Sequence, residues 1–429
     1  MTIRLQSLLM LSLAIVVIAG NSARADLWPQ FRGATGDGVS KETNLPSKWS
    51  ADSGVLWKTD LPGFGNSSPA VTEKHVVLTT QTKEDALWVL VLDRATGKLT
   101  KEIKVGSGKL AAKGAASLYA HRHNPATPSP IAIGNRVWAF FGSGLLVCVD
   151  AASGDIVWQK DMVAEYGEYD ITFGMGSTPR YWNGLLYVSC LTKGVSYVVA
   201  FDAESGKEKW KVDRRLPAKD DGPDAYSTPI VVGHELLISG SDHVNSYDLL
   251  TGKQLWVSNG LAIDSPYGRV IASPVATEEG IVIATSGNPG GGGKGRVIAV
   301  NALGEQGDVS SKRVWTQEKS SPDSSTPVAI NGLVFMLADA GILTCAHVRT
   351  GEVKYTKRLG EGPYHASLVA ADGKIYAQST TGTCTVIKAD DSGDVLAENK
   401  LEGQFFSTPA ISNGVVFLRA YERIYAISK

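Results

Sequence analysis

A unit that begins with a Ser/Thr-Pro step recurs along the chain at intervals of 41 to 61 residues. An eighth copy has Ser367 followed by Leu368 in place of the proline. Self-similarity at such a period is typical of arrays of small units, none of which can bury a core alone. The fold must therefore be built by packing copies of one unit. The seven complete steps are Ser68-Pro69, Ser129-Pro130, Thr178-Pro179, Thr228-Pro229, Ser273-Pro274, Thr326-Pro327 and Thr408-Pro409.

Residues 177–210 display the content of one unit. Two apolar runs, at 185–190 and 197–201, lie between turns that contain glycine. A shorter run precedes them, and a segment ending at Trp210 follows them. This pattern indicates four short antiparallel strands joined by three turns.

The last turn of the unit repeats the pattern Asp-x-x-Ser/Thr-Gly, as at residues 93–97 and 202–206. The glycine permits a positive φ, and the Asp and Ser/Thr side chains can bond to the local backbone. An aromatic residue follows four positions later in several copies. Because this position recurs, we expect these rings to pack between neighbouring units rather than to bind a ligand. They are Trp57, Trp158, Trp210, Trp256, Trp315 and Tyr355.

The two ends of the repeat array complement each other. The last copy stops after its third strand at Ile427, whereas residues 54–61 resemble a fourth strand without the first three. Pairing them would close a ring and remove the open ends of a linear array. The chain is therefore predicted to be all-β, an eight-bladed β-propeller of four-stranded antiparallel blades, with strand 54–61 joining the C-terminal blade.

The first 25 residues have the pattern of a secretory signal peptide. Arg4 precedes an apolar run, and Ala-Arg-Ala ends at Ala25. We expect cleavage after Ala25 and export to the periplasm or the extracellular space. The mature chain would comprise an arm at residues 26–53 and a single propeller domain at 54–429. No later segment is apolar enough to cross a bilayer, so we expect no transmembrane segment.

Charge and cysteine content exclude several classes of function. The chain has 42 basic and 43 acidic residues, and the signal segment removes two arginines, which leaves 40 − 43 = −3. This balance provides no basic field for nucleic acid. Export permits disulfides, but no C-x-x-C pair occurs, and we expect buried free thiols. We also expect the protein to be a monomer. The four cysteines, each in an apolar run, are Cys148, Cys190, Cys345 and Cys384.

Together, the Ser/Thr-Pro steps and the Asp-x-x-Ser/Thr-Gly turns followed by Trp resemble the repeats of the PQQ-type (quinoprotein alcohol dehydrogenase-like) β-propeller family. The resemblance covers essentially the whole mature chain and is specific for fold, not for activity. The family includes quinone-dependent dehydrogenases, the outer membrane assembly factor BamB and many secreted propellers. The motif Trp-Pro-x-Phe-Arg-Gly at residues 28–33 is similar to the opening of the secreted members.

The loops that precede the Ser/Thr-Pro steps are expected to converge at one mouth of the central channel. They are rich in aromatic residues with a few charges, which suits a peptide or a small organic ligand. The alternative is that the polar groups of the loops hydrogen-bond to one another and the aromatic rings fill the channel. The pair His121 and His123 lacks an identifiable metal-ligand partner, so no metal site is predicted. The candidate ligand-binding residues are Asn66, His121, Arg122, His123, Phe173, Asp224, Tyr226, Tyr267, Arg269, Tyr364, His365 and Phe405.

These observations favour an exported, non-catalytic propeller that binds a protein, peptide or glycan at the channel mouth, with a BamB-like assembly role as one form. The alternative is a PQQ-dependent oxidoreductase acting on alcohols or sugars. The resemblance implies PQQ with calcium for that class, and many of its members have adjacent cysteines over the quinone. This chain has no adjacent cysteines and no C-x-x-C-H haem motif, and no calcium ligands can be placed by residue. No cofactor is therefore expected, and no catalytic residue is assigned.

Overall fold

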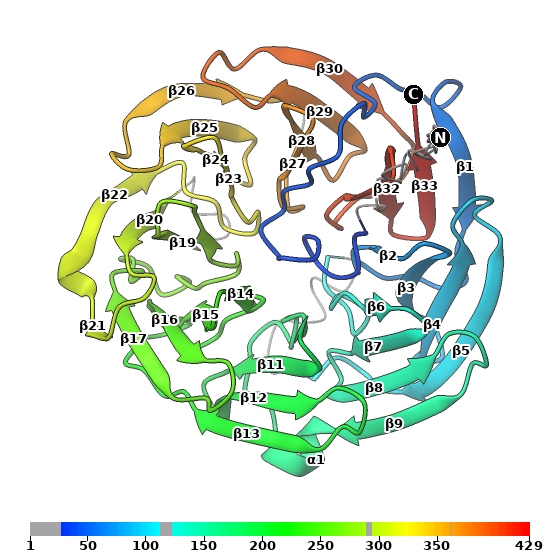
Figure 1. The fold of residues 1–429 in the computed structure, drawn as a ribbon, viewed down its shortest axis with the longest axis horizontal. Helices are drawn as coiled ribbons and strands as arrows, with labels where there is room; N and C mark the ends of the chain where they lie inside the picture. The colour runs from blue at the N-terminus through cyan, green and yellow to red at the C-terminus, as the bar shows by residue number, and fades with distance from the viewer. Residues whose placement is uncertain (1–26, 112–121, 289–293, 361) are drawn as a thin grey trace, which may run out of the picture.

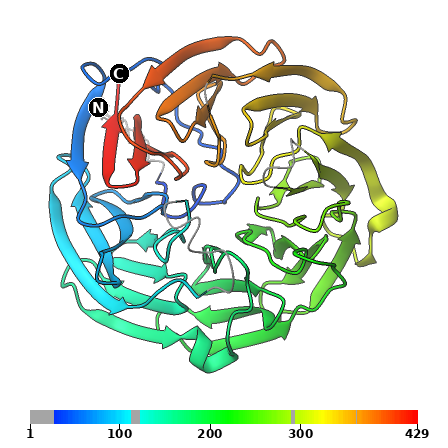
Figure 2. The same cartoon turned by 180° about the vertical axis from the view of Figure 1, so that it is seen from behind.

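Eight antiparallel sheets surround a central channel in the computed structural model, which describes residues 27–111, 122–288, 294–360 and 362–429 (Figure 1, and from behind in Figure 2). Each sheet is a blade whose innermost strand lines the channel. The prediction of an all-β, eight-bladed propeller is confirmed. In the described part of the chain, no helix is long and apolar enough to span a membrane.

The blades follow one another in chain order. Blade one consists of β2 (Ala70–Val71), β3 (His75–Gln81), β4 (Ala86–Asp93) and β5 (Leu99–Ser107), and blade two of β6 (Ile131–Ile133), β7 (Arg136–Phe140), β8 (Leu145–Asp150) and β9 (Ile156–Asp161). Blade three consists of β10 (Arg180–Trp182), β11 (Leu185–Leu191), β12 (Ser196–Asp202) and β13 (Glu208–Asp213), and blade four of β14 (Ile230–Val232), β15 (Glu235–Gly240), β16 (His243–Asp248) and β17 (Gln254–Asn259). Blade five consists of β18 (Val275–Ala276), β19 (Ile281–Gly287), β20 (Lys294–Asn301) and β22 (Arg313–Lys319), and blade six of β23 (Val328–Ile330), β24 (Leu333–Leu337), β25 (Ile342–His347) and β26 (Val353–Arg358). Blade seven consists of β27 (Val369–Ala371), β28 (Lys374–Gln378), β29 (Thr383–Lys388) and β30 (Val395–Lys400), and blade eight of β31 (Ala410–Ser412), β32 (Val415–Ala420), β33 (Arg423–Ile427) and β1 (Val55–Asp60).

Three short elements depart from the repeat. The helix α1 (Met162–Tyr166) follows blade two, and its N-cap Asp161 accepts hydrogen bonds from two backbone N–H groups. The strand β21 (Gly307–Asp308) adds a parallel fifth strand to the outer edge of blade four. The 3-10 helix η2 (Ser310–Lys312) leads into β22.

The ring closes as predicted. Strand β1 pairs antiparallel with β33, in a register that sets Lys58 opposite Tyr425. Alternate residues of β1 face the blade, including Trp57, whereas Leu56 points to solvent. The first strand of the described chain is thus the outer strand of the last blade, and closure depends on non-covalent pairing between residues more than 360 positions apart.

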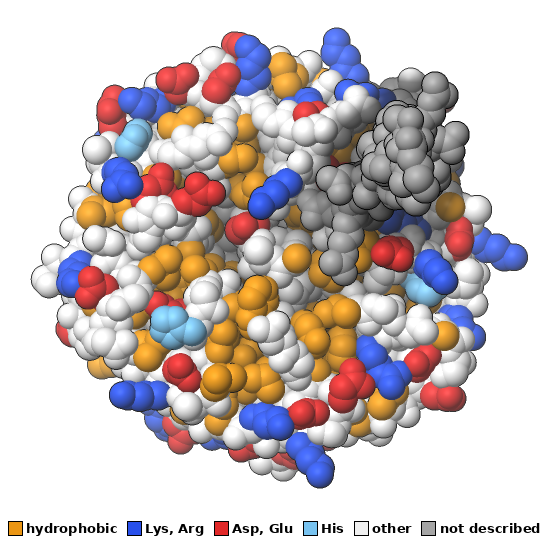
Figure 3. Space-filling view, viewed as in Figure 1, with side chains coloured by type: hydrophobic (Ala, Val, Ile, Leu, Met, Phe, Trp, Pro, Cys, Tyr) orange, Lys and Arg blue, Asp and Glu red, His pale blue; other side chains and the backbone are white. Residues whose placement is uncertain are grey.

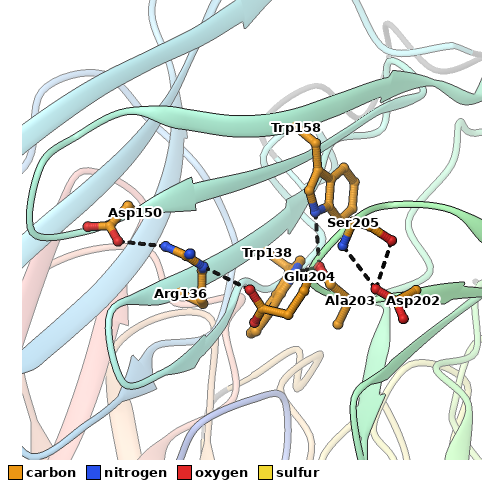
Figure 4. Close-up of polar contacts among 8 residues, drawn as sticks. All are labelled: Arg136, Trp138, Asp150, Trp158, Asp202, Ala203, Glu204 and Ser205. Carbon is orange, nitrogen blue, oxygen red and sulfur yellow. Dashed lines mark hydrogen bonds and ion pairs between the residues drawn. The ribbon is translucent and has the colours of Figure 1, made fainter.

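The recurring tryptophans join neighbouring blades, as expected from their position. The Nε1 of Trp158 donates to the carbonyl oxygen of Ala203 in the next blade at 2.9 Å, and Trp138 donates to the same oxygen at 2.8 Å (Figure 4). A Cβ at Gly206 would lie 2.8 Å from the Trp158 ring, so glycine is required there. Equivalent bonds to the next blade come from Trp57, Trp210 and Trp315.

The same turn is held by ionic and Asx-type contacts (Figure 4). Asp202 accepts hydrogen bonds from the backbone N–H and the hydroxyl of Ser205. Arg136 bridges Asp150 in its own blade at 2.6 Å and Glu204 in the next at 3.2 Å. The conspicuous Asp-x-x-Ser-Gly motif is therefore accounted for by packing between blades.

The described cysteines are all buried and unpaired, as expected. Burial raises the pKa of Cys190 to about 11, so this thiol stays protonated at neutral pH. Such thiols behave as small apolar core residues.

The segment before β1 lies across one end of the channel (dark blue in Figure 1). Its backbone pairs with the inner strands of several blades, through Trp28 with Val71 and through Gly38 and Ser40 with Ala370. On this face, hydrophobic side chains gather around the centre of the ring and charged ones towards its periphery (Figure 3). Trp28, Leu45 and Trp49 of the segment are buried in one apolar cluster with residues of neighbouring blades, so the segment covers apolar surface of the ring.

Arg32 fixes this segment in the channel. Its guanidinium is fully buried and donates to backbone carbonyls on two blades, including Leu368 at 2.8 Å and Pro327 at 2.7 Å. Within the segment it also donates to the backbone carbonyls of Asp37 and Gly36. Burial lowers the pKa of Arg32 to about 9, which still leaves the side chain charged at neutral pH.

Candidate functional site

The recurring Ser/Thr steps form a closed ring of hydrogen bonds around the channel. The backbone N–H of each one donates to the hydroxyl of its counterpart in the next blade, at 2.9 to 3.3 Å, and Thr408 closes the circle onto Ser68. The proline that usually follows has no N–H, so no further donor is left unpaired there. This hydroxyl ring consists of Ser68, Ser129, Thr178, Thr228, Ser273, Thr326, Ser367 and Thr408.

A cavity of about 490 Å³ extends from this ring to the loops that precede it. All eight hydroxyl-ring residues line it, and Phe31 of the N-terminal segment lines its inner end. Its volume lies within the range of small-molecule and peptide pockets. The other lining residues are Asn66, Arg122, His123, Thr127, Phe173, Gly176, Tyr226, Tyr267, Arg269, Ile271, Ser324, His365 and Phe406.

The residues that precede each hydroxyl-ring residue face the channel lumen and the protein core in turn. In all eight blades the residue two positions earlier lines the cavity, as Phe406 does before Thr408. The residue three positions earlier is buried away from it, as Phe405 is. This is the two-residue period of extended backbone.

The structure brings together eight of the twelve candidate residues. The residues that line the cavity are Asn66, Arg122, His123, Phe173, Tyr226, Tyr267, Arg269 and His365. His121 lies outside the described residues. The structure also adds lining residues that the sequence analysis missed, among them Phe406, Ser324 and the hydroxyl ring itself. The alternation described above is the signal that could have found them.

Placing Tyr364, Phe405 and Asp224 at the cavity was wrong. Tyr364 and Phe405 occupy the buried position of the alternation, and the Phe405 ring packs on Tyr425 at a centroid distance of 6.1 Å. Asp224 is fully buried, and its carboxylate accepts the backbone N–H of Thr172 at 2.8 Å. Burial raises the pKa of Asp224. These three side chains hold the loops in place.

Arg122 links opposite sides of the cavity. It lies in the loop that enters blade two, yet it donates to the hydroxyl of Ser324, which precedes blade six, at 3.0 Å. Its Nη2 also lies 3.6 Å from Asp339. Asn66 holds the backbone of Arg122 by donating to its carbonyl at 2.8 Å. The Arg122 side chain therefore connects the loops of blades two and six beside the cavity.

The two histidines at the cavity have different environments. Burial lowers the pKa of His123 to about 4, so the ring is neutral at pH 7, and its Nε2 lies 3.0 Å from the carbonyl of Gly174. His365 lies 2.9 Å from Asp339 through Nδ1. Burial alone would raise the pKa of Asp339, but the His365 bond and charge, with Arg122 nearby, lower it below its usual range.

Asp323 occupies the buried position where other blades have Ala, Val, Tyr, Phe, Gly or Met. Neither of its carboxylate oxygens has a hydrogen-bond partner in the described part of the chain. Burial, with the nearby charge of Asp339, raises the pKa of Asp323 to about 7. A buried carboxylate without hydrogen-bond donors favours its neutral form, and the charges of Arg269 and Arg122 offset this only in part.

Replacing Asp323 by asparagine is expected to stabilise the protein at alkaline pH. The native pKa of Asp323, about 7, lies above its pKa in the unfolded state, about 4. Ionisation of Asp323 therefore destabilises the native state, and this destabilisation grows as the pH rises from about 4 through about 7. The neutral amide avoids that penalty. Thermal unfolding at pH 8.5 should therefore show a higher midpoint for Asp323→Asn than for the wild type, with a smaller difference at pH 4.5. A lower midpoint at pH 8.5 would mean that the carboxylate has a partner.

Comparisons with known proteins identify the repeat. A family model described as outer membrane protein assembly factor BamB matches residues 39–161 and 125–357. BamB from Yersinia pestis is 25% identical over 297 residues, which cover 66% of this chain and 68% of that protein. The structure of BamB from Moraxella catarrhalis superposes with a TM-score of 0.61 at 12% identity, covering 87% of this chain and 99% of that one. A europium-containing methanol dehydrogenase gives 0.69 at 10% identity, covering 92% and 90%. At such low identities the two structures show the fold alone.

The residues around the cavity do not fit a calcium-bound quinone. In the described ranges, no three His, Cys, Asp or Glu side chains come together as metal ligands. Two carboxylates beside the cavity already have partners: Asp339 pairs with His365, and Asp221 pairs with Lys193 at 2.7 Å. Calcium requires six to eight oxygen ligands, so this donor set is too small.

Proposed function

The chain belongs to the PQQ-type repeat β-propeller family, whose matching model is described as outer membrane protein assembly factor BamB, and we propose from this premise that it is an exported, non-catalytic scaffold for protein assembly. Its partner is a protein, of which a peptide segment binds in the channel cavity. The mature protein starts at Asp26, and residues 54–429 act as one domain. Residues 1–25, the proposed signal peptide, lie outside the described residues.

The observation that carries this proposal is the composition of the cavity. Aromatic side chains lie beside guanidinium groups and hydroxyls at its mouth, and Tyr267 is 60% exposed there. Aromatic and arginine side chains dominate the energetics of protein interfaces. A glycan would also use aromatic surfaces, but most of the matching relatives are named as assembly factors for a protein, which favours a polypeptide.

The mouth of the cavity is expected to supply most of the binding energy. Removing both aromatic rings in Tyr267→Ala/Phe406→Ala should weaken the binding of selected peptides by about tenfold or more. The peptides would be selected from a synthetic array of 12-residue sequences anchored at their N-termini, with the purified protein lacking residues 1–25 as the probe. Affinities would then be measured by fluorescence anisotropy.

A matched control is Leu250→Ala, in the outer turn of blade four, where the side chain is 77% exposed. This variant should bind like the wild type. Equal binding by wild type and double variant would place the binding surface elsewhere. Quinone absorbance retained after desalting of protein incubated with PQQ and calcium would favour the oxidoreductase alternative instead.

A further inference from the structure

We propose that the cavity recognises the C-terminal carboxylate of a polypeptide, which Arg269, Tyr226 and the hydroxyl ring bind together. This inference rests on the proposed function and specifies which part of a partner enters the site. It follows from three features: a buried cation without hydrogen bonds, a ring of uncommitted O–H donors, and a channel that is closed at its inner end.

Arg269 lines the cavity with its side chain only 7% exposed. The guanidinium donates no hydrogen bond to the described part of the chain, and its Nε is buried without a partner. Asp221 forms an ion pair with it at 3.6 Å, too long for a hydrogen bond, and Asp323 is a second acidic group near it. A buried guanidinium normally donates several bonds, and leaving them unmade is costly. The missing acceptor is expected to come from an anionic ligand.

Two aromatic rings hold this guanidinium in place. It stacks over Phe173 at 4.3 Å from the ring centroid and lies 6.0 Å from that of Tyr226. The Tyr226 hydroxyl is also buried and donates no hydrogen bond to a described residue, and Tyr226 lines the same cavity. Burial raises the pKa of Tyr226, so its O–H remains a donor. A second donor is therefore positioned beside the first before any ligand binds.

The hydroxyl ring adds further donors. Each of its oxygens accepts a backbone N–H from the preceding blade, as Ser273 does from Thr228. None of the eight hydroxyls donates a hydrogen bond to a described residue in return, although all of them line the cavity. Their protons remain available to an acceptor in the lumen. A carboxylate has two oxygens that each accept more than one hydrogen bond.

The closed inner end of the channel selects a chain terminus. Phe31 of the N-terminal segment lines that end, and the adjacent Arg32 is buried and donates to backbone carbonyls on two blades. A polypeptide in the cavity cannot thread through the propeller, so it enters by an end. The donors it meets match a carboxylate and would repel the ammonium group of an N-terminus. The aromatic mouth then contacts the residues that precede the carboxylate.

The test compares each array-selected peptide as a free acid and as its C-terminal amide. The amide should bind the wild-type protein about 10- to 100-fold more weakly, because it loses charge-assisted hydrogen bonds. Arg269→Gln should weaken the acid by a similar factor and the amide hardly at all. Tyr226→Phe, which removes one hydroxyl group, should weaken the acid by up to about tenfold. Arg349→Gln, at an exposed outer turn of blade six, should match the wild type.

The outcomes separate this inference from the proposed function. Equal binding of acid and amide would overturn the carboxylate assignment and leave peptide binding at the cavity intact. If amides with an internal Asp or Glu bind as tightly as the acids, the terminal assignment fails. Loss of binding by every peptide in both forms would overturn the proposed function itself. The acid and amide pair on wild-type protein gives the answer even if Arg269→Gln does not fold.

Discussion

Trp57→Ala is expected to lower the free energy of unfolding by about 3 kcal/mol, because it removes a half-buried indole from the strand that closes the ring. The indole donates to the carbonyl of Arg94 at 3.0 Å and packs against Phe417 at a centroid distance of 6.0 Å. A Cβ at Gly97 would lie 2.4 Å from the ring, so the fit is close on that side as well. Chemical denaturation of the mature protein would measure the loss.

Leu56→Ala serves as the control on the same strand. Leu56 is 57% exposed and points away from the blade, so its truncation should change stability by less than about 1 kcal/mol. Similar effects of the two substitutions would argue against closure through β1. Trp57→Ala should also expose β1 to proteolysis at temperatures where the wild type resists.

Arg32→Met is expected to destabilise the protein by about 3 kcal/mol or more, since it leaves several buried carbonyl groups without a donor. The acceptors include Leu368 and Pro327 on neighbouring blades, so the substitution also detaches the N-terminal segment from the channel. Methionine retains an unbranched stem without the charge, so part of the buried volume is kept. The loss would be measured by thermal unfolding, and detachment by limited proteolysis within residues 26–53.

Arg32→Lys tests whether charge or geometry matters at this position. Lysine keeps the charge but not the planar fork that reaches several carbonyls at once, so an intermediate loss is expected. An Arg32→Met protein with wild-type stability and an intact segment would mean that the segment is held by its other contacts, such as the stacking of Trp49 on Tyr376.

The fold could be predicted because each blade repeats the same local constraints. The Asp-x-x-Ser/Thr-Gly turn requires a glycine with positive φ, and Gly206 and Gly252 have it, with a tryptophan ring packed against each. The lone strand at 54–61 had one place to pair once eight copies were counted. Because the pattern recurs from blade to blade, the prediction of the blades does not depend on any single residue.

The cavity could be predicted in place but not in every residue. Aromatic residues in the loops indicated a mouth, yet Phe405 and Phe406 are adjacent, and only the second faces the lumen. Residue type alone does not distinguish these two positions, whereas the two-residue alternation counted back from each Ser/Thr step does. The closure of the channel by Arg32 could not be predicted, because its carbonyl acceptors come from blades almost 300 residues or more away in sequence.

The most direct test of the account is site-specific photo-crosslinking. Phe406 at the cavity mouth and Leu250 on the outer turn of blade four would each be replaced by p-benzoylphenylalanine in the mature protein, and each protein irradiated with an array-selected peptide. A crosslinked product is expected from position 406, competed by free peptide acid, and none from position 250. Crosslinking at position 250 with none at 406 would contradict it.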